Sequence, residues 1–122
     1  MKYVRMYADK NGDSHFEDVE VEMSLVDFSP PTPPMGVSSS MPSMNVVFAS
    51  TPVGWYGEPH PVPGRFLIIY LAGEMEVTVS DGELRRFGPD SVVLVEDTSG
   101  KGHASRAISN DNVLAVMVQL TD

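Results

Sequence analysis

The sequence predicts an all-β protein, a sandwich or a barrel built from many short strands. Short apolar segments recur along the chain and are bounded by turns rich in glycine and proline. Several of these segments alternate apolar and polar residues with the period of two that marks a half-buried strand. No segment longer than about ten residues has the 3.6-residue period of a helix, so we expect little or no helix.

The N-terminal third predicts two strands and an arm. Residues 3–7 form the first expected strand, and Asn11-Gly12 is a turn pair suited to positive φ. Over residues 17–25 apolar side chains alternate with acidic and polar ones, which predicts one half-buried strand. Residues 29–43 are rich in proline and serine, and proline cannot donate to a strand ladder. We therefore expect an extended, irregular Pro/Ser-rich arm there.

The rest of the chain predicts a dense series of strands, with a hairpin turn at Asp81-Gly82. The expected strands are residues 44–49, 66–71, 74–80, 83–87, 91–95, 103–109 and 113–120. Two of them, 66–71 and 113–120, are apolar at consecutive positions, so both of their faces need cover. One face can line a barrel interior while the other meets a second sheet or a second subunit. We expect a homodimer.

Composition and charge exclude several classes of protein. The 122 residues fit one domain, with N-terminal strands and the Pro/Ser-rich arm over 1–43 and a barrel core over 44–122. The net charge of −9 argues against a nucleic-acid partner, because a phosphate backbone requires clustered lysine and arginine. No segment is apolar enough to span a membrane or to act as a signal core, so we expect a cytoplasmic protein. Without cysteine, the chain has no disulfide and no thiolate site.

Two segments resemble the paired motifs of the cupin family. Residues 60–73, from His60 to Gly73, look like the first motif, which carries two histidines, a carboxylate and a closing glycine. Residues 87–103 look like the second motif, which ends in a histidine, here His103. The resemblance implies a cupin-type double-stranded β-helix, or jelly-roll barrel. The chain also resembles small uncharacterised bacterial cupin-domain proteins.

Two of the four metal-binding positions of these motifs are replaced. In the family register His60 keeps the first histidine, whereas Val62 stands at the second and Phe66 at the carboxylate. A zinc or iron ion takes three or four protein ligands. The resemblance leaves His60 and His103 as metal ligands, with Glu76 as a substitute carboxylate if it faces inward. We expect no tightly bound metal, with iron, manganese or zinc at the two histidines as the alternative.

A mostly apolar pocket is expected inside the barrel. Phe66, Ile68 and Tyr70 share one strand face, which lines the pocket in cupins, and simple core filling is the alternative for them. Trp55 is expected at the pocket mouth or as a seal at the barrel end. Together with Val62, the expected ligand-binding residues are therefore Phe66, Ile68 and Trp55. Such a wall suits a small organic molecule.

Two imidazoles are the expected acid and base of this pocket. An imidazole gives or takes a proton near neutral pH, so His103 and His60 are the first catalytic candidates, with Tyr70 or Glu76 assisting.

Several alternatives stay open. His103 can instead be a structural histidine bonded to Glu96 or Asp97. The chain can be a small-molecule-binding enzyme that transfers protons, of the isomerase, cyclase or lyase type. It can also be a metal-dependent, dioxygenase-like cupin, or a non-catalytic ligand-binding or sensory module, because one fold carries many functions.

Overall fold

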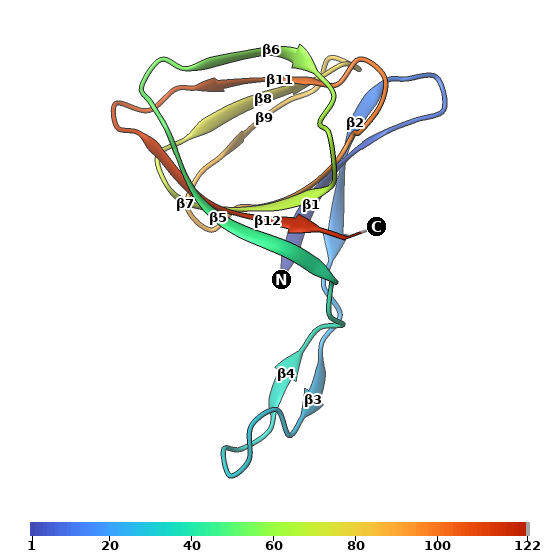
Figure 1. The fold of residues 1–122 in the computed structure, drawn as a ribbon, viewed down its shortest axis with the longest axis vertical. Helices are drawn as coiled ribbons and strands as arrows, with labels where there is room; N and C mark the ends of the chain where they lie inside the picture. The colour runs from blue at the N-terminus through green and yellow to red at the C-terminus, as the bar shows by residue number, and fades with distance from the viewer. Residues whose placement is uncertain (122) are drawn as a thin grey trace.

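Two facing sheets form an open barrel from which one hairpin projects (Figure 1). The computed structural model describes residues 1–121, which form strands, turns and loops but no helix. In this part of the chain the larger sheet has the strand order β2-β1-β10-β7-β12-β5, the smaller sheet has the order β6-β11-β8-β9, and β3 pairs with β4. The strands are β1 (Lys2–Ala8), β2 (Ser14–Glu20), β3 (Ser24–Val26), β4 (Met35–Val37), β5 (Ser43–Thr51), β6 (Tyr56–His60), β7 (Phe66–Ala72), β8 (Met75–Val79), β9 (Leu84–Phe87), β10 (Val92–Glu96), β11 (His103–Ala107) and β12 (Val113–Leu120).

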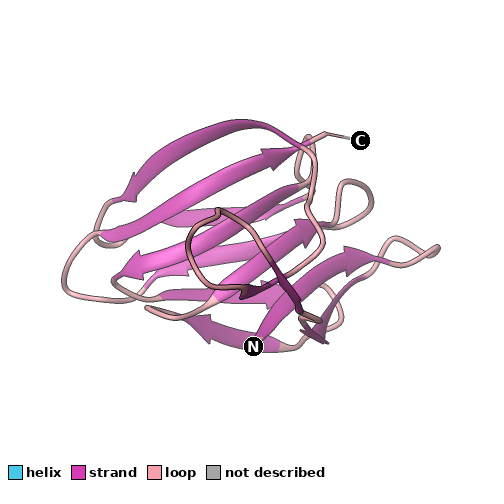
Figure 2. Ribbon diagram, turned by 90° about the horizontal axis from the view of Figure 1, so that it is seen from below, coloured by secondary structure: helices cyan, strands magenta, loops and turns pink. Residues whose placement is uncertain are grey.

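The prediction of an all-β jelly-roll barrel without helix is confirmed. Figure 2 shows the strands of the barrel running side by side, with the loops gathered at their ends. The first twenty residues belong to the larger sheet, because β1 pairs parallel with β10 and antiparallel with β2. Across the described residues, no helix is long and apolar enough to cross a membrane.

The prediction of one continuous strand over residues 17–25 is wrong. β2 ends at Glu20, and the chain then leaves the barrel to form the β3–β4 hairpin (Figure 1). The expected irregularity of residues 29–43 is also wrong in part, because β4 lies inside that range. Pro30, Pro31, Pro33 and Pro34 fall in the loop between the two short strands, and Pro42 lies between β4 and β5, so no ladder hydrogen bond is required of any of them. We call residues 21–42 the hairpin arm.

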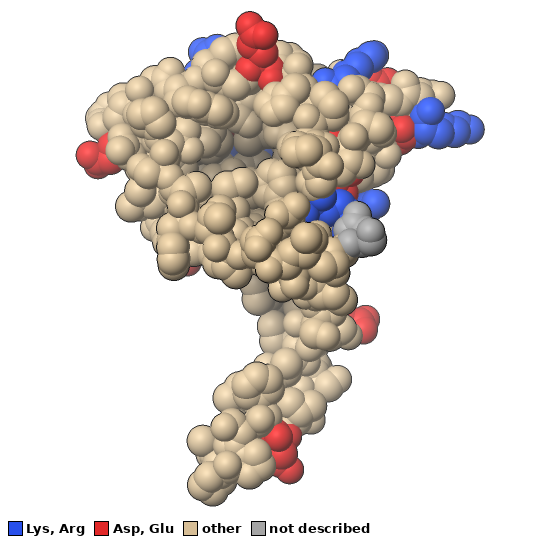
Figure 3. All heavy atoms as spheres, viewed as in Figure 1, with Lys and Arg blue, Asp and Glu red and all other residues tan. Residues whose placement is uncertain are grey.

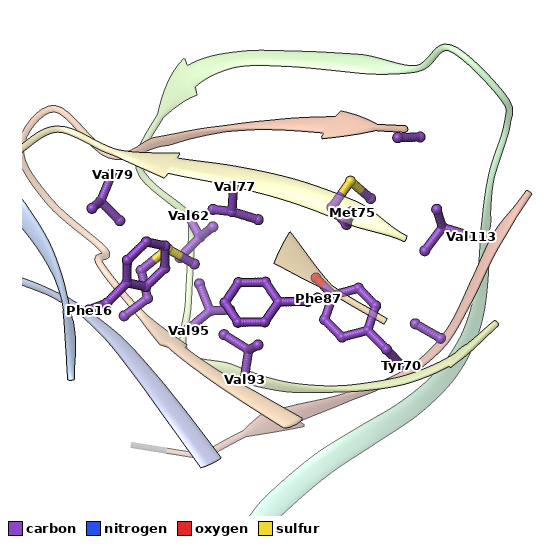
Figure 4. Packing of buried hydrophobic residues seen from close by; sticks show 13 residues of the cluster. Phe16, Val62, Tyr70, Met75, Val77, Val79, Phe87, Val93, Val95 and Val113 are labelled. Carbon is purple, nitrogen blue, oxygen red and sulfur yellow. The ribbon is translucent and has the colours of Figure 1, made fainter. Parts of the chain in front are cut away.

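The hydrophobic core lies between the two sheets (Figure 4). Alternate residues of β8 point inward, which places Met75, Val77 and Val79 in the core. The Phe87 ring stacks on Tyr70 with ring centroids 5.9 Å apart and meets Phe16 edge-on at 5.9 Å. The buried cluster consists of Met6, Phe16, Val62, Tyr70, Met75, Val77, Val79, Phe87, Val93, Val95, Ala107, Val113 and Ala115.

Candidate functional site

The two histidines of the resembling motifs lie side by side on neighbouring strands. His103, the first residue of β11, pairs with His60 of β6 on one side and with Val79 of β8 on the other. Val79 is buried, so His103 shares the inner face of the smaller sheet. The two imidazole centroids are 5.9 Å apart. Because β6 is the edge strand of its sheet, His60 is exposed, whereas His103 is only 7% exposed.

A glycine allows this close approach of the strands. Gly102 precedes His103 and has φ +73°, a conformation that residues with a side chain rarely adopt. A Cβ atom there would lie 2.0 Å from the carbonyl carbon and oxygen of His60. Beyond the pair, the backbone N–H of Val62 donates to the carbonyl oxygen of Asp97 at 3.2 Å. The segment after His60 is thereby tied to the loop that precedes His103.

Asp97 fixes the orientation of the His103 ring through a contact with its Nδ1 atom. Its side chain is fully buried, and its Oδ2 lies 2.7 Å from Nδ1 of His103 and accepts a hydrogen bond from the Ser14 hydroxyl at 3.2 Å. An ionised carboxylate can only accept, so with Asp97 ionised the proton of the His103 ring lies on Nδ1 and is donated to Oδ2. In the neutral ring this leaves the lone pair on Nε2. Within residues 1–121, Oδ1 of Asp97 has no hydrogen-bond partner.

The His60 ring is held in the same tautomer by a different acceptor. Its Nδ1 lies 2.6 Å from the backbone carbonyl oxygen of Glu58, which can only accept a proton. The neutral form of His60 therefore also carries its lone pair on Nε2. The structure thus presents two bases at adjacent positions, one buried against a carboxylate and one exposed to solvent.

The donor set does not fit a tightly held metal ion. The other two positions of the first motif hold Val62, which is buried in the core, and Phe66, which packs against it. No group of three histidine or carboxylate side chains that could hold a metal occurs among the described residues. Two imidazoles fall short of the three or four ligands that zinc or iron takes from a protein. No step of the chemistry below is therefore assigned to a metal.

An apolar cavity opens at the mouth of the barrel near this pair. It has a volume of about 400 Å³, and Figure 3 shows the hollow between the two sheets. Phe66 of β7 and Met117 of β12 form part of its wall, and the side-chain amides of Asn45 and Gln119 bond to each other at 3.1 Å. The remaining lining residues are Val46, Val47, Pro63 and Gly64. Neither His60 nor His103 lines this cavity.

The expected ligand-binding residues are divided between the cavity and the core. Phe66 lines the cavity, and Ile68 packs against the core cluster from the same strand face. Val62 is buried near Asp97. Trp55 lies in the turn before β6, where its carbonyl oxygen accepts from Ala107 at the opposite end of β11 from His103. Four residues of strand, about 13 Å, therefore separate Trp55 from the histidine pair.

Two of the expected assisting residues lie away from the histidine pair. The expectation that Glu76 faces inward is wrong: Met75 and Val77 on either side point into the core, so Glu76 faces outward and pairs with Arg86 at 3.2 Å. Tyr70 is inside the barrel, but it stacks on Phe87. Burial raises the pKa of Tyr70, which keeps its hydroxyl protonated.

The partners of His103 were foreseeable only in part. From the sequence, a structural His103 was expected to bond to either Glu96 or Asp97. In the structure its partner is Asp97. The hydrogen bond from Ser14 to Asp97 could not be predicted from the sequence, because the two residues are 83 positions apart and a single serine in a strand forms no recognisable pattern.

The third histidine lies outside the site. Nε2 of His15 is 2.7 Å from Asp9, and Nδ1 is 2.7 Å from Asp81, so the ring joins the β1–β2 turn to the β8–β9 turn. The hydrogen bond with Asp9, followed by that with Asp81, raises the pKa of His15. His15 therefore serves as an internal control for substitutions at the other two histidines.

Comparison with known proteins supports the fold. The sequence matches no protein-family model, and no curated protein matches it. The cupin domain of Cnp3 from Schizosaccharomyces pombe is similar with a TM-score of 0.55 and 17% identity, over 99% of this chain and 84% of that one. A cupin superfamily protein from Desulfitobacterium hafniense has a TM-score of 0.51 and 20% identity, over 70% and 73% of the two chains. KdgF from a Halomonas species has a TM-score of 0.50 and 20% identity, over 81% and 87%.

Proposed function

Because the chain has the cupin fold, we propose that its barrel mouth binds a small organic molecule and that His103 exchanges a proton with it. The contact between Asp97 and His103 supports this proposal most strongly. A fully buried carboxylate 2.7 Å from Nδ1 holds a buried imidazole with Nε2 as the base. The same carboxylate stabilises the imidazolium that forms when Nε2 takes up a proton.

The chemistry that suits this arrangement is proton transfer without a metal. Nε2 of His103 takes a proton from an acidic C–H or O–H group of the bound molecule. His60, 5.9 Å away between ring centroids and exposed to solvent, exchanges protons with water and returns one to the molecule or to a departing group. Return of the proton to a different atom gives an isomerisation or a cyclisation, and loss of a departing group gives an elimination.

The apolar part of the molecule occupies the cavity beside Phe66. Its volume of about 400 Å³ falls in the range of small-molecule sites, about 300–1,000 Å³. Gly64, which lines the cavity, is four residues from His60, so an extended chain between them spans at most about 14 Å. A small molecule with an apolar body in the cavity and a polar end toward the histidines bridges this separation.

A deuterium-exchange experiment on the full chain tests the proposal. Fragments with an apolar ring and a carbonyl-activated C–H group are screened by amide NMR, and those that shift Phe66 and Met117 are incubated in deuterium oxide. We expect the protein to accelerate C–H exchange of a bound fragment and His103→Gln to reduce this acceleration at least about tenfold. His15→Gln makes the same chemical change outside the site and should leave the rate unchanged.

A non-catalytic ligand-binding module is the second candidate. It is favoured by one observation, that neither histidine lines the cavity. In that case fragments shift the amides of the cavity, exchange is no faster than in water, and His103→Gln leaves binding unchanged. That combination would exclude the proton-transfer role while retaining the binding site.

A further inference from the structure

One wall of the apolar cavity carries a pair of side-chain amides. Asn45 of β5 and Gln119 of β12 lie directly opposite each other in the strand register, and Nδ2 of Asn45 donates to Oε1 of Gln119 at 3.1 Å. Gln119 shares one face of β12 with Met117 and Ala115, because side chains alternate along a strand. Ala115 belongs to the buried core, so the amide pair lies on the inner face of the sheet, at the mouth of the barrel.

The hydrogen bond between the two amides leaves a donor and an acceptor unused. Each side-chain amide has a carbonyl oxygen that accepts and an NH₂ group that donates. The bond uses Nδ2 of Asn45 and Oε1 of Gln119, so Oδ1 of Asn45 and Nε2 of Gln119 remain. Among the described residues, the bond that joins the two side chains is the only hydrogen bond that either of them makes. The cavity wall therefore offers a bound molecule both an N–H donor and a carbonyl acceptor.

Gly64 keeps the free amide nitrogen accessible. It belongs to the segment that joins β6 to β7, and a Cβ atom at this position would lie 3.9 Å from Nε2 of Gln119. Apart from the chain neighbours of Gly64, no other atom lies within 4 Å of that Cβ position. The absence of a side chain therefore leaves open space beside Nε2, in the segment that leads back to His60.

Among residues 1–121, no charged side chain lines this cavity. Its lining residues besides the amide pair are Val46, Val47, Pro63, Gly64, Phe66 and Met117. Transfer of a charged group from water to such a wall is unfavourable without a charged partner. A carboxylate would satisfy only the free donor, and an ammonium or amidinium group only the free acceptor. A neutral group that both donates and accepts satisfies the two free amide atoms and requires no opposite charge.

We infer that the molecule bound in the cavity carries a carboxamide group, as a primary amide or a lactam, and that Asn45 and Gln119 recognise it. Its carbonyl oxygen accepts a hydrogen bond from Nε2 of Gln119, and its N–H donates to Oδ1 of Asn45. Its apolar body packs on Phe66 and Met117. Because the inference rests on the proposed function, the substrate is an apolar molecule with a neutral amide at one end and, at the other, the group that exchanges a proton with His103.

Three planar probes of nearly equal shape test this recognition on the full chain: benzamide, benzoate and benzamidinium. Benzamide donates and accepts, benzoate only accepts, and benzamidinium only donates. Their dissociation constants are measured at neutral pH by NMR titration of the backbone amides of Phe66 and Met117. We expect benzamide to bind at least about tenfold more tightly than either ion, because each ion loses hydration and leaves one side-chain amide atom unpaired.

Gln119→Glu should reverse the preference among the probes. The variant exchanges one NH₂ group for an oxygen, so the cavity loses its free donor and gains a negative charge. We expect benzamide to bind at least about tenfold more weakly, and benzamidinium at least about tenfold more tightly, than they bind wild type. Asn112→Asp is the matched control, because Asn112 bonds to Ser50 at the other end of the β5–β12 pair and does not line the cavity. It should leave all three dissociation constants unchanged.

Gly64→Ala tests where the probe lies, because it adds one methyl group beside Nε2 of Gln119. The fold has room for this methyl group, but a molecule bonded to Nε2 would meet it. We expect the variant to weaken benzamide binding at least about threefold. Circular dichroism verifies that every variant is folded.

Equal affinities of the three probes would overturn the amide recognition. An unchanged order of the probes in Gln119→Glu, unchanged benzamide binding in Gly64→Ala, or the failure of all three probes to shift the cavity amides would overturn it as well. None of the probes has an activated C–H group, so these results do not depend on deuterium exchange. A preference for benzamide without accelerated exchange of any fragment would therefore exclude only the proton-transfer role of His103.

Discussion

Replacement of His103 by leucine should destabilise the barrel strongly. The substitution introduces an apolar side chain of similar length. It leaves the carboxylate of Asp97 fully buried, with only the Ser14 hydroxyl as a side-chain donor to it. Removal of the donor from a buried hydrogen bond to a charged group costs about 1–3 kcal/mol or more, because the remaining acceptor is left unsatisfied in an apolar surrounding. A domain has about 5–15 kcal/mol of stability in total, so the variant should still fold and be measurable.

Urea denaturation of four proteins gives the test: wild type, His103→Leu, Asp97→Leu and the double variant. The double variant removes the charge and its partner together, so it should be more stable than His103→Leu by at least about 1 kcal/mol. Ser14→Ala is the smaller perturbation, about 1.5 kcal/mol, because it deletes one hydrogen bond to the charge. If His103→Leu lost less than about 1 kcal/mol, or if the double variant recovered nothing, the buried pair would not exist as described.

Three further substitutions have defined outcomes. Because the pKa of His15 is raised in the folded protein, the stability that the protonated ring contributes is complete below about pH 6.5 and is lost as the pH rises through the folded-state pKa. The melting temperatures of wild type and His15→Gln should therefore converge as the pH is raised from about 6 to about 9. Burial pushes the pKa of Glu96 upward, but hydrogen bonds from its two arginine partners outweigh this and lower it. Its contribution is therefore present above about pH 4.5 and lost at lower pH, and Glu96→Gln should lack this acid-dependent loss in a thermal melt series. Gly82→Ala should cost about 1–2 kcal/mol, because position 82 has positive φ. Gly102→Ala should cost clearly more, because position 102 also has positive φ and its Cβ would in addition meet the backbone of His60. Equal losses for the two glycine variants would show that the close approach is not needed.

The sequence predicted the barrel because its strands alternate or are bounded by recognisable turns. It also predicted that His60 and His103 would be neighbours, through the spacing of the two resembling motifs, and the ring distance of 5.9 Å agrees. β6 had no strand signal, since Gly57 and Pro59 lie within it. An edge strand tolerates proline because one row of its backbone groups needs no ladder partner.

The misplaced residues have physical explanations. A shift of one residue in a strand moves every side chain to the other face, and β8 begins at Met75, which directs Glu76 outward. The alternation over residues 17–25 is real, but the same pattern serves a strand that packs on its own core and one that packs on another surface. Leu25, on the hairpin arm, is 78% exposed.

The most direct test of the site is the tautomer of its two imidazoles, measured by long-range proton–nitrogen NMR of the histidine side chains. We expect His60 and His103 in their neutral forms to carry the proton on Nδ1 and the lone pair on Nε2. Asp97→Asn should remove this preference at His103 and leave His60 unchanged. A neutral His103 protonated at Nε2 in the wild-type protein would contradict the account, because no base would then face the bound molecule.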